Sequence, residues 1–357
     1  MTTTTATKID DDQGLNEGPR DDVVPFLARV ERALKDALIG DASVDDAPLG
    51  ERAAPLVLAG GAKRARPRLI HAVGRAVGAE TAALVDLAVA AELIHAGSLL
   101  HDDVIDAGTE RRGLPTVNAT DGNLVAVLAG DFLLARALAT VAPWGSDVAA
   151  RAAHTLAEMV QGVSTESAHR GRAVSLTTWT RIAEQKTGAL FAFSASGPLL
   201  VRHVDGARTR DAVRAIAATD RAGRAFGVLF QLADDVLDFS PGRGKDPFAD
   251  LRNASPNVVV TLAAERGVRA PHGDGVDEAA GARFVADAVR AGVGRDVAQV
   301  ADRALDEIAG LLDVCGREAL WMLEEARALS RAALSVFAAD EPSTKGARTH
   351  EGLHGPA

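Results

Sequence analysis

The stretch "SLLHDDVIDAGTERRG", residues 98–113, ends an apolar run with Asp102, Asp103 and Asp106. On a helix, positions four residues apart lie on nearly the same face, so Asp102 and Asp106 are expected to point the same way, with Asp103 beside them. Carboxylates placed this close repel one another unless a cation or a basic group neutralises them. The stretch therefore predicts a helix that carries a cation-binding site at its end.

The same pattern occurs a second time, because "LLHDDVID" at 99–106 is echoed by "QLADDVLD" at 231–238, which contains Asp234, Asp235 and Asp238. A solvated helix end is the alternative for one such motif, but two matching motifs that follow apolar runs favour binding. Mg²⁺ takes oxygen ligands, is held by one or two carboxylates and fills its other positions with water and substrate phosphates. Two facing motifs are therefore expected to hold several Mg²⁺ ions around one diphosphate.

Two other metal centres are disfavoured by the residues present. The pair His101-Asp102 is compatible with a metal-dependent phosphohydrolase, but the remaining histidines do not form an obvious ligand set. A di-iron helical bundle needs paired Glu-x-x-His motifs, and no convincing pair occurs. Magnesium with a polyphosphate remains the favoured ligand combination.

The rest of the chain predicts helices. Ala, Leu, Arg and Glu dominate, and apolar residues recur at helical spacing, as in residues 23–38 and 82–100. The main β-branched run, residues 257–263, is compatible with a strand or with a buried helix start, and residues 266–281 predict a loop. We expect one all-α domain of ten or more helices, packed as a bundle.

The composition bounds the kind of protein. Of 357 residues 47% are hydrophobic, enough for a sizeable core, and a net charge of −10 argues against nucleic-acid binding. The lone Cys315 excludes an intrachain disulfide and a thiolate cluster, which fits a reducing cytoplasm. No secretory signal and no uncharged apolar run of about 18 residues is found, so no membrane span is expected. We expect disordered polar tails at 1–22 and 339–357 around a domain at 23–338.

Basic residues cluster next to the acidic motifs. Lys63, Arg64 and Arg66 follow a Gly pair in "GGAKRARPRL" (60–69), where glycine lets the backbone approach an anion and Arg offers a fork to phosphate oxygens. Three more basic segments are "ERRG" (110–113), "EQKTGALF" (184–191) and "GRGKDPFADL" (242–251). Together these residues predict one site that binds metal and polyphosphate.

These segments, with "GD" at 130–131, occur in the order of the trans-isoprenyl diphosphate synthase (polyprenyl synthetase) family, which the chain resembles over about residues 25–335. The resemblance is to its medium- and long-chain members. It implies an isoprenoid synthase-type helical bundle in which the two aspartate motifs face each other across a deep central cavity. It also implies a homodimer and three Mg²⁺ ions per active site.

The resemblance assigns roles residue by residue. The principal Mg²⁺ ligands would be Asp102, Asp106 and Asp234, supported by Asp103, Asp235 and Asp238. The allylic diphosphate would be held by Arg111, Lys186 and Lys245, and isopentenyl diphosphate by Lys63, Arg66, His95 and Arg112. Catalytic positions beside the reacting carbons would be Lys186, Thr187 and Gln231. The alternatives are a core histidine for His95 and a hydroxyl that bonds its own helix backbone for Thr187.

The resemblance implies ionisation of the allylic substrate, attack by the isopentenyl double bond and proton loss, with no side-chain nucleophile. Gly97 and Ser98 lie one turn before the first motif and are small, so no bulky residue is expected to stop the growing chain there. Phe132 could form a deeper floor, with core packing as its alternative. We expect a product of six or more isoprene units, released through transient membrane contact at most; a geranylgeranyl product is the main alternative.

The chain departs from the family after Arg252. There the family carries a Gly-Lys-x-Thr-Leu-Pro-like segment, whereas this chain reads "NASPN" at 253–257, so a second lysine is missing. Two other classes share the fold. A class I terpene cyclase would replace the second motif by an Asn/Ser/Glu motif, and a non-catalytic subunit of a heteromeric synthase would lose aspartates. Both motifs are intact here, which favours a catalytic synthase.

Overall fold

A computed structural model describes residues 23–39, 49–58, 64–111, 113–202, 209–240, 247–273 and 275–338. Within these ranges the predicted all-α fold is confirmed, with sixteen α-helices and one antiparallel pair of two-residue strands. The predicted tails at 1–22 and 339–357 lie outside the described residues, as do Lys63, Arg112 and Lys245.

The helices before the middle of the chain are α1 (Val23–Ile39), α2 (Leu49–Val57), α3 (Ala65–Val77), α4 (Thr81–Ile105), α5 (Val117–Thr120), α6 (Asn123–Val141), α7 (Ser146–Ala168) and α8 (Leu176–Ala183). The later helices are α9 (Ala189–Arg202), α10 (Arg210–Leu237), α11 (Ala249–Arg252), α12 (Val258–Glu265), α13 (Glu278–Ala291), α14 (Val293–Ala309), α15 (Leu312–Cys315) and α16 (Leu320–Ala338). The strands are β1 (Glu110–Arg111) and β2 (Leu114–Pro115).

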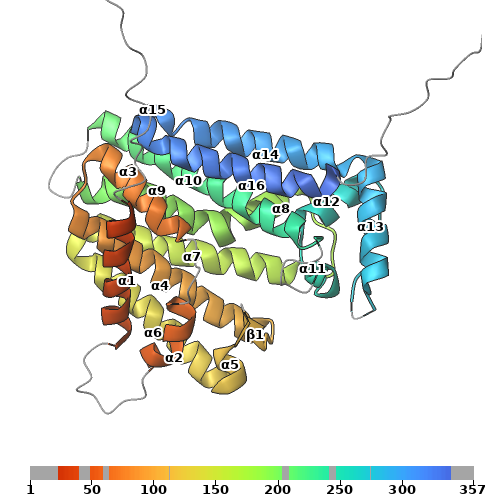
Figure 1. Ribbon diagram of the computed structural model, residues 1–357, viewed down its shortest axis with the longest axis horizontal. Coiled ribbons are helices and arrows are strands. Elements are labelled where there is room, and N and C mark those ends of the chain that lie inside the picture. The colour runs from red at the N-terminus through yellow and green to blue at the C-terminus, as the bar shows by residue number, and fades with distance from the viewer. Residues whose placement is uncertain are drawn as a thin grey trace, which may run out of the picture.

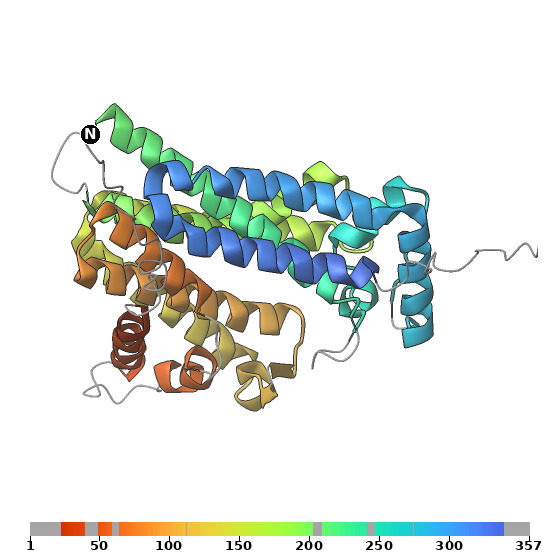
Figure 2. The same cartoon turned by 45° about the horizontal axis from the view of Figure 1, so that its top comes forward.

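The long helices form a bundle around α4 and α10. Figure 1 shows α10, α14 and α16 along one side of the bundle, α4 and α6 along the other, and α7 between them. In the turned view of Figure 2, α13 stands across one end of this bundle. Both aspartate motifs lie where a long helix stops, because Asp106 caps the C-terminus of α4 and Asp238 caps that of α10.

The core consists of two apolar clusters that share α9. One lies among α3, α9, α10, α14 and α16, and there Phe191 and Phe226 pack edge to face with ring centroids 5.0 Å apart. The other lies among α1, α4, α6 and α9 and includes the fully buried Leu34, Leu93 and Leu133. Burial of each such leucine contributes about 2 kcal/mol, which offsets the entropy cost of ordering the helices.

Two segments of the described chain are long and apolar enough to cross a membrane, judged by length and composition alone. These are α4 and the stretch Asn123–Trp144, which is α6 with a short 3₁₀ turn (Ala142–Trp144) after it. The most apolar window of α4 is 72% buried inside the bundle, as a core helix would be, whereas that of Asn123–Trp144 is 33% buried. The apolar surface of α6 is therefore largely uncovered in one chain.

Side-chain caps decide two details of the secondary structure: one that the sequence left open and one loop end that it placed too late. The β-branched run at 257–263 begins a helix, α12, because the Asn257 side chain accepts a hydrogen bond from the Val259 amide at 2.8 Å and caps the N-terminus. The predicted loop at 266–281 is shorter than expected, since Asp277 caps α13 by accepting a hydrogen bond from the Ala280 amide at 2.7 Å.

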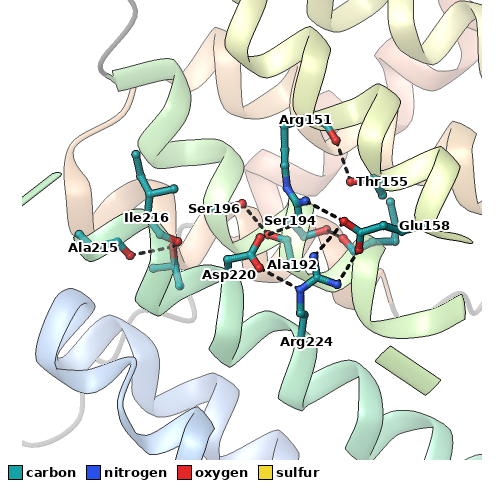
Figure 3. A network of polar contacts seen from close by, with 12 residues as sticks. Arg151, Thr155, Glu158, Ala192, Ser194, Ser196, Ala215, Ile216, Asp220 and Arg224 are labelled. Carbon is teal, nitrogen blue, oxygen red and sulfur yellow. Dashed lines mark hydrogen bonds and ion pairs between the residues drawn. The ribbon is translucent and has the colours of Figure 1, made fainter. Parts of the chain in front are cut away.

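A charged network joins α7 to α10 (Figure 3). The Arg224 guanidinium on α10 donates to both carboxylate oxygens of Glu158, at 2.6 and 3.1 Å, and to Asp220 at 2.9 Å. Arg151, two turns before Glu158 on the same face of α7, pairs with Asp220 at 2.6 Å. Burial alone would raise the pKa of Glu158, but the two arginines outweigh it and lower that pKa. The network fixes how α7, which carries Met159, lies against α10.

Glycines let the backbone turn between α8 and α9 lie directly on α10. A Cβ atom added at Gly227 would lie 2.4 Å from the Cα atom of Gly188, and one added at Gly223 would lie 2.6 Å from the carbonyl oxygen of Phe191. Real side chains never come this close to backbone, so only glycine fits at these positions. The contact fixes the turn Glu184–Gly188 relative to α10.

Replacing Gly227 by alanine is expected to lower the free energy of unfolding by about 2 kcal/mol. The added methyl group must push two backbones apart, and this cost exceeds the roughly 1 kcal/mol that alanine gains over glycine inside a helix. Urea denaturation of both proteins measures the difference. Gly275→Ala is the matched control, because nothing lies within 4 Å of the added Cβ atom. Equal stability of the two variants would contradict the close packing.

Candidate active site

A cavity of about 820 Å³ lies between the ends of α4 and α10. Both aspartate motifs reach it, because Asp102 and Asp106 line it from α4 and Asp234 lines it from α10. Its apolar wall comes from α6, α7 and α10 and contains, among others, Leu134, Leu156, Met159, Val163 and Phe230. The cavity thus has a charged part next to an extended apolar part.

The carboxylates of the cavity occupy an electrostatically unfavourable place. The C-terminus of a helix carries partial negative charge, so acidic groups at the ends of α4 and α10 are repelled by the backbone as well as by one another. Burial raises the pKa of the Asp102 carboxyl, Asp106 and Glu166 raise it further, and Lys186 and Arg111 oppose the rise. A cation bound here would remove this penalty.

The donor set fits magnesium held in part by a substrate. Within the described ranges, no three His, Cys, Asp or Glu side chains converge closely enough to enclose a metal ion by themselves. The aspartates at the two helix ends offer carboxylate oxygens, which Mg²⁺ prefers, and Mg²⁺ is ordinarily held by one or two carboxylates plus water and phosphate oxygens. Asp102, Asp106 and Asp234 are the residues that could hold it.

The middle aspartate of the first motif points away from the cavity. Asp103 is buried and accepts hydrogen bonds from the Arg111 guanidinium, at 2.9 Å from Nε and 2.6 Å from Nη2. The amide of Asn118 donates to the Asp103 carbonyl oxygen at 3.2 Å. Asp103 therefore fixes Arg111, which itself lines the cavity, at the start of the β1–β2 turn.

The middle aspartate of the second motif has the same kind of position. Asp235 is buried and accepts hydrogen bonds from the Trp179 indole at 2.8 Å, the Val258 amide at 2.8 Å and the Gln231 side chain at 2.7 Å. Burial raises its pKa well above the usual range, and the nearby Asp250 adds to the rise. Asp235 therefore joins α10 to α8 and α12. The third aspartate, Asp238, accepts a hydrogen bond from the Asp250 amide at 3.1 Å.

Lys186 and Thr187 reach the cavity from a π-helical turn, Glu184–Gly188, and such turns often occur at functional sites. Lys186 Nζ pairs with the Glu166 carboxylate at 2.6 Å. Burial lowers the pKa of Lys186, but Glu166 and Asp102 outweigh burial and raise it, so the ammonium stays charged. The Thr187 hydroxyl donates to the side-chain oxygen of Gln231 at 2.8 Å.

Arg66 and His95 line the same cavity from α3 and α4. The Arg66 guanidinium lies over the Phe191 ring at 4.7 Å, and its Nε is buried without a hydrogen-bond partner among the described residues. Burial lowers the pKa of Arg66 to about 10, while Glu92 opposes the shift. The group thus remains charged with an unused donor.

Arg64, the neighbour of Arg66, has a structural role instead. It donates hydrogen bonds to Glu31, Glu92 and the Val57 carbonyl oxygen and so joins α3 to α1, α2 and α4.

The three residues expected to affect chain length lie differently. Ser98 lines the cavity, whereas Gly97 and Phe132 do not. A Cβ atom at Gly97 would lie 3.0 Å from Leu134 Cδ2, so Gly97 is where α4 and α6 pack closely. Phe132 packs with the apolar residues around α4 and α6, with the Arg136 guanidinium 6.0 Å from its ring centroid. Leu134, two residues further on, lines the cavity instead.

Sequence reasoning missed several residues of the site. Glu166 pairs with Lys186, and Arg170 pairs with Asp106, but neither belongs to a segment that signalled binding. Asp250 belongs to the basic segment 242–251, but the sequence assigned it no role in the site. Burial raises the pKa of Asp250 to about 7, Asp238 and Asp234 add to the rise, and Asn257 opposes it with a 2.7 Å hydrogen bond.

The chain is similar to known prenyl diphosphate synthases over most of its length. The family model described as "Polyprenyl synthetase" matches residues 48–280. A nonaprenyl diphosphate synthase from Mycobacterium tuberculosis is 35% identical over 277 residues, which cover 73% of this chain and 80% of that protein. Heptaprenyl diphosphate synthase component 2 from Geobacillus stearothermophilus is 34% identical, with 80% and 89% covered. The crystal structure of a polyprenyl synthase from Caulobacter crescentus, complexed with calcium and isoprenyl diphosphate, superposes with a TM-score of 0.73 at 27% identity, with 88% and 95% covered.

Proposed function

Because the chain belongs to the polyprenyl synthetase family, we propose that it is a Mg²⁺-dependent all-trans polyprenyl diphosphate synthase that elongates an allylic diphosphate with isopentenyl diphosphate. The observation that carries this proposal is the cavity itself. It unites carboxylates from two helix ends, the cations Arg66, Arg111 and Lys186, and an apolar wall built from α4, α6, α7 and α10. Such a site suits a substrate with a diphosphate head and an isoprenoid tail.

The cations of the cavity would hold the two diphosphates. Arg111 and Lys186 line the cavity near the first motif and would bind the allylic diphosphate in this proposal. Arg66 and His95 line it from α3 and α4 and would bind isopentenyl diphosphate. Asp102, Asp106 and Asp234 would hold the Mg²⁺ ions, three in this proposal, and bound Mg²⁺ would supply positive charge that favours departure of the diphosphate. The protein's fixed charges act in the same direction.

The reaction breaks the allylic C–O bond, and the bonding electrons leave with pyrophosphate. In this proposal the carbocation forms beside the Thr187 hydroxyl and the Gln231 side-chain amide, which are hydrogen-bonded to each other. Their dipoles would stabilise the positive charge, and neither group acts as a nucleophile. The apolar wall excludes water from it. The double bond of isopentenyl diphosphate then attacks the cation, and the proton lost from the new chain goes to the departing pyrophosphate.

The proposed product has thirty carbons or more. One of the relatives is named as a nonaprenyl diphosphate synthase and another as a component of a heptaprenyl diphosphate synthase. One turn before Asp102 the cavity is lined by the small Ser98 and by Leu99, without an aromatic side chain. A chain this long is poorly soluble in water, so we propose transient membrane contact during release from a cytoplasmic enzyme. Geranylgeranyl diphosphate, with twenty carbons, is the competing product.

We propose a homodimer that covers the apolar face of α6 and α7. Leu124 is 72%, Leu128 45% and Val160 68% exposed, which is unusual for neighbouring apolar side chains. A second copy of the chain would remove them from water. A heteromeric assembly is the alternative, because one relative is named as a component of a synthase. Light scattering of the purified chain separates a dimer from a monomer.

The purified chain alone, given Mg²⁺, isopentenyl diphosphate and an allylic starter of fifteen carbons, is expected to make a ladder of products that ends at thirty carbons or more. Mass spectrometry of the dephosphorylated products measures the ladder. A ladder that stops at twenty carbons would support the geranylgeranyl alternative. No product with any starter from five to twenty carbons would indicate that a partner subunit is required.

A further inference from the structure

Arg170, two residues after the end of α7, does not itself line the cavity but contacts Asp106, which does. One of its terminal nitrogens pairs with Asp106, which lines the cavity. Its Nε is buried and has no hydrogen-bond partner among the described residues. A guanidinium has five N–H donors, and a buried donor without an acceptor is unfavourable. Arg170 therefore has donor capacity that the described protein atoms do not use.

The loop that carries Arg170 is hydrogen-bonded to the segment 253–257. The Gly171 amide donates to the Ala254 carbonyl oxygen at 2.8 Å. Ala254 has a φ of 51°, a left-handed conformation that costs energy for any residue with a Cβ atom. The same segment is held at its far end by Asn257, which bonds the Asp235 carbonyl oxygen at 3.0 Å. A strained residue thus fixes the Arg170 loop against the second aspartate motif.

The charged side chains around the cavity show why a further cation such as Arg170 would favour diphosphate binding. Residues 253–257, Asn-Ala-Ser-Pro-Asn, bring no cation to their side of the site. Among the described residues, the carboxylates that line the cavity are Asp102, Asp106, Asp131 and Asp234, and the Arg and Lys side chains that line it are Arg66, Arg111 and Lys186. Two of these cations already face carboxylates, since Arg111 pairs with Asp103 and Lys186 with Glu166. A diphosphate bound here adds further negative charge.

We propose that Arg170 is a further diphosphate-binding residue, which donates hydrogen bonds from its unused nitrogens to the allylic diphosphate next to Asp106. The inference rests on the proposed function for the identity of the substrate, but the binding of a diphosphate can be measured without turnover. Arg170 then supplies, from the loop after α7, a positive charge that the segment 253–257 does not supply.

The test is calorimetric titration of inorganic pyrophosphate into the full chain at saturating Mg²⁺. Arg170→Ala is expected to weaken pyrophosphate binding about tenfold to a hundredfold, and Arg170→Lys is expected to restore part of the loss. Arg172→Ala is the matched control, because it removes the same charge from an exposed position in the same loop. The control is expected to bind pyrophosphate within twofold of the unmodified chain. In turnover assays, Arg170→Ala should raise KM for the allylic diphosphate by about the same factor as it weakens pyrophosphate binding. KM for isopentenyl diphosphate should change less than twofold.

Two results would overturn the inference. One is unchanged pyrophosphate binding in Arg170→Ala together with a lower Mg²⁺ requirement, which would mean that Arg170 only neutralises Asp106. The other is an equal loss in Arg172→Ala, which would mean that general charge is responsible. Failure of the proposed function looks different: the unmodified chain would bind pyrophosphate through Arg170 but condense no prenyl diphosphates. Thermal unfolding of Arg170→Ala within about 2 °C of the unmodified chain shows that the fold is retained.

Discussion

Asp102→Asn is expected to reduce turnover about a thousandfold without unfolding the protein. The substitution removes a negative charge from the cavity while it keeps the size of the side chain, so it weakens the site for Mg²⁺ and for the leaving diphosphate. Folding should not suffer. Burial raises the pKa of Asp102, so the ionised carboxylate at pH 7 is less stable in the folded chain than in the unfolded one. A neutral amide avoids this penalty.

A melting experiment gives a readout that does not depend on activity. Mg²⁺ with pyrophosphate is expected to raise the unfolding temperature of the unmodified chain, because ligands that bind only the folded state stabilise it. The increase should be largely lost in Asp102→Asn, whereas the ligand-free variant melts at the same temperature or higher. Asp302→Asn, on the exposed face of α14, is the matched control and should behave like the unmodified chain. An unchanged ligand-induced shift in Asp102→Asn would rule out Asp102 as a magnesium ligand.

Asp235→Ala, unlike Asp102→Asn, is expected to destabilise the fold. It should lower the free energy of unfolding by about 3 kcal/mol. The Trp179 indole, the Val258 amide and the Gln231 side chain all donate to this carboxyl, and its removal leaves these donors without an acceptor inside the protein. Urea denaturation measures the loss. Asp235→Asn keeps one acceptor oxygen and should lose less.

Asp234→Ala is the comparison for this prediction, since it removes the adjacent aspartate, which lines the cavity. It should abolish turnover at nearly unchanged stability. If Asp234→Ala and Asp235→Ala lost equal stability, the buried anchor role of Asp235 would be wrong. If Asp235→Ala were inactive yet as stable as the unmodified chain, its carboxyl would act on the substrate or metal instead.

Helical spacing was sufficient to predict the parts of the site that depend on local geometry. The i and i+4 relation put Asp102 and Asp106 on one face, and both line the cavity. It also put Asp103 beside them, whereas that side chain turns toward Arg111. The sequence spacing of a motif cannot show which neighbour a side chain will find, because that depends on elements that pack from elsewhere.

Long-range partners explain most of what the sequence did not reveal. Asp235 accepts hydrogen bonds from Trp179 and Val258 because α8 and α12 pack against α10. The sequence around Asp235 contains no pattern that predicts either partner. Arg170 and Glu166 belong to the end of α7 and the loop after it, where helical periodicity stops. The same holds for the residue expected to end the cavity. The apolar run of α6 contains both Phe132 and Leu134, and its packing against α4 determines that Leu134 lines the cavity.

The split within each aspartate motif has a consequence for gene duplication. A duplicated copy released from selection for chemistry can lose Asp102, Asp106 or Asp234 at little cost to folding. It cannot as readily lose Asp103 or Asp235, whose carboxyls are bonded inside the protein. Inactive paralogues descended from such a chain should therefore keep Asp103 and Asp235 after they have lost the aspartates that line the cavity. This pattern of substitution would distinguish an inactive paralogue from an active enzyme.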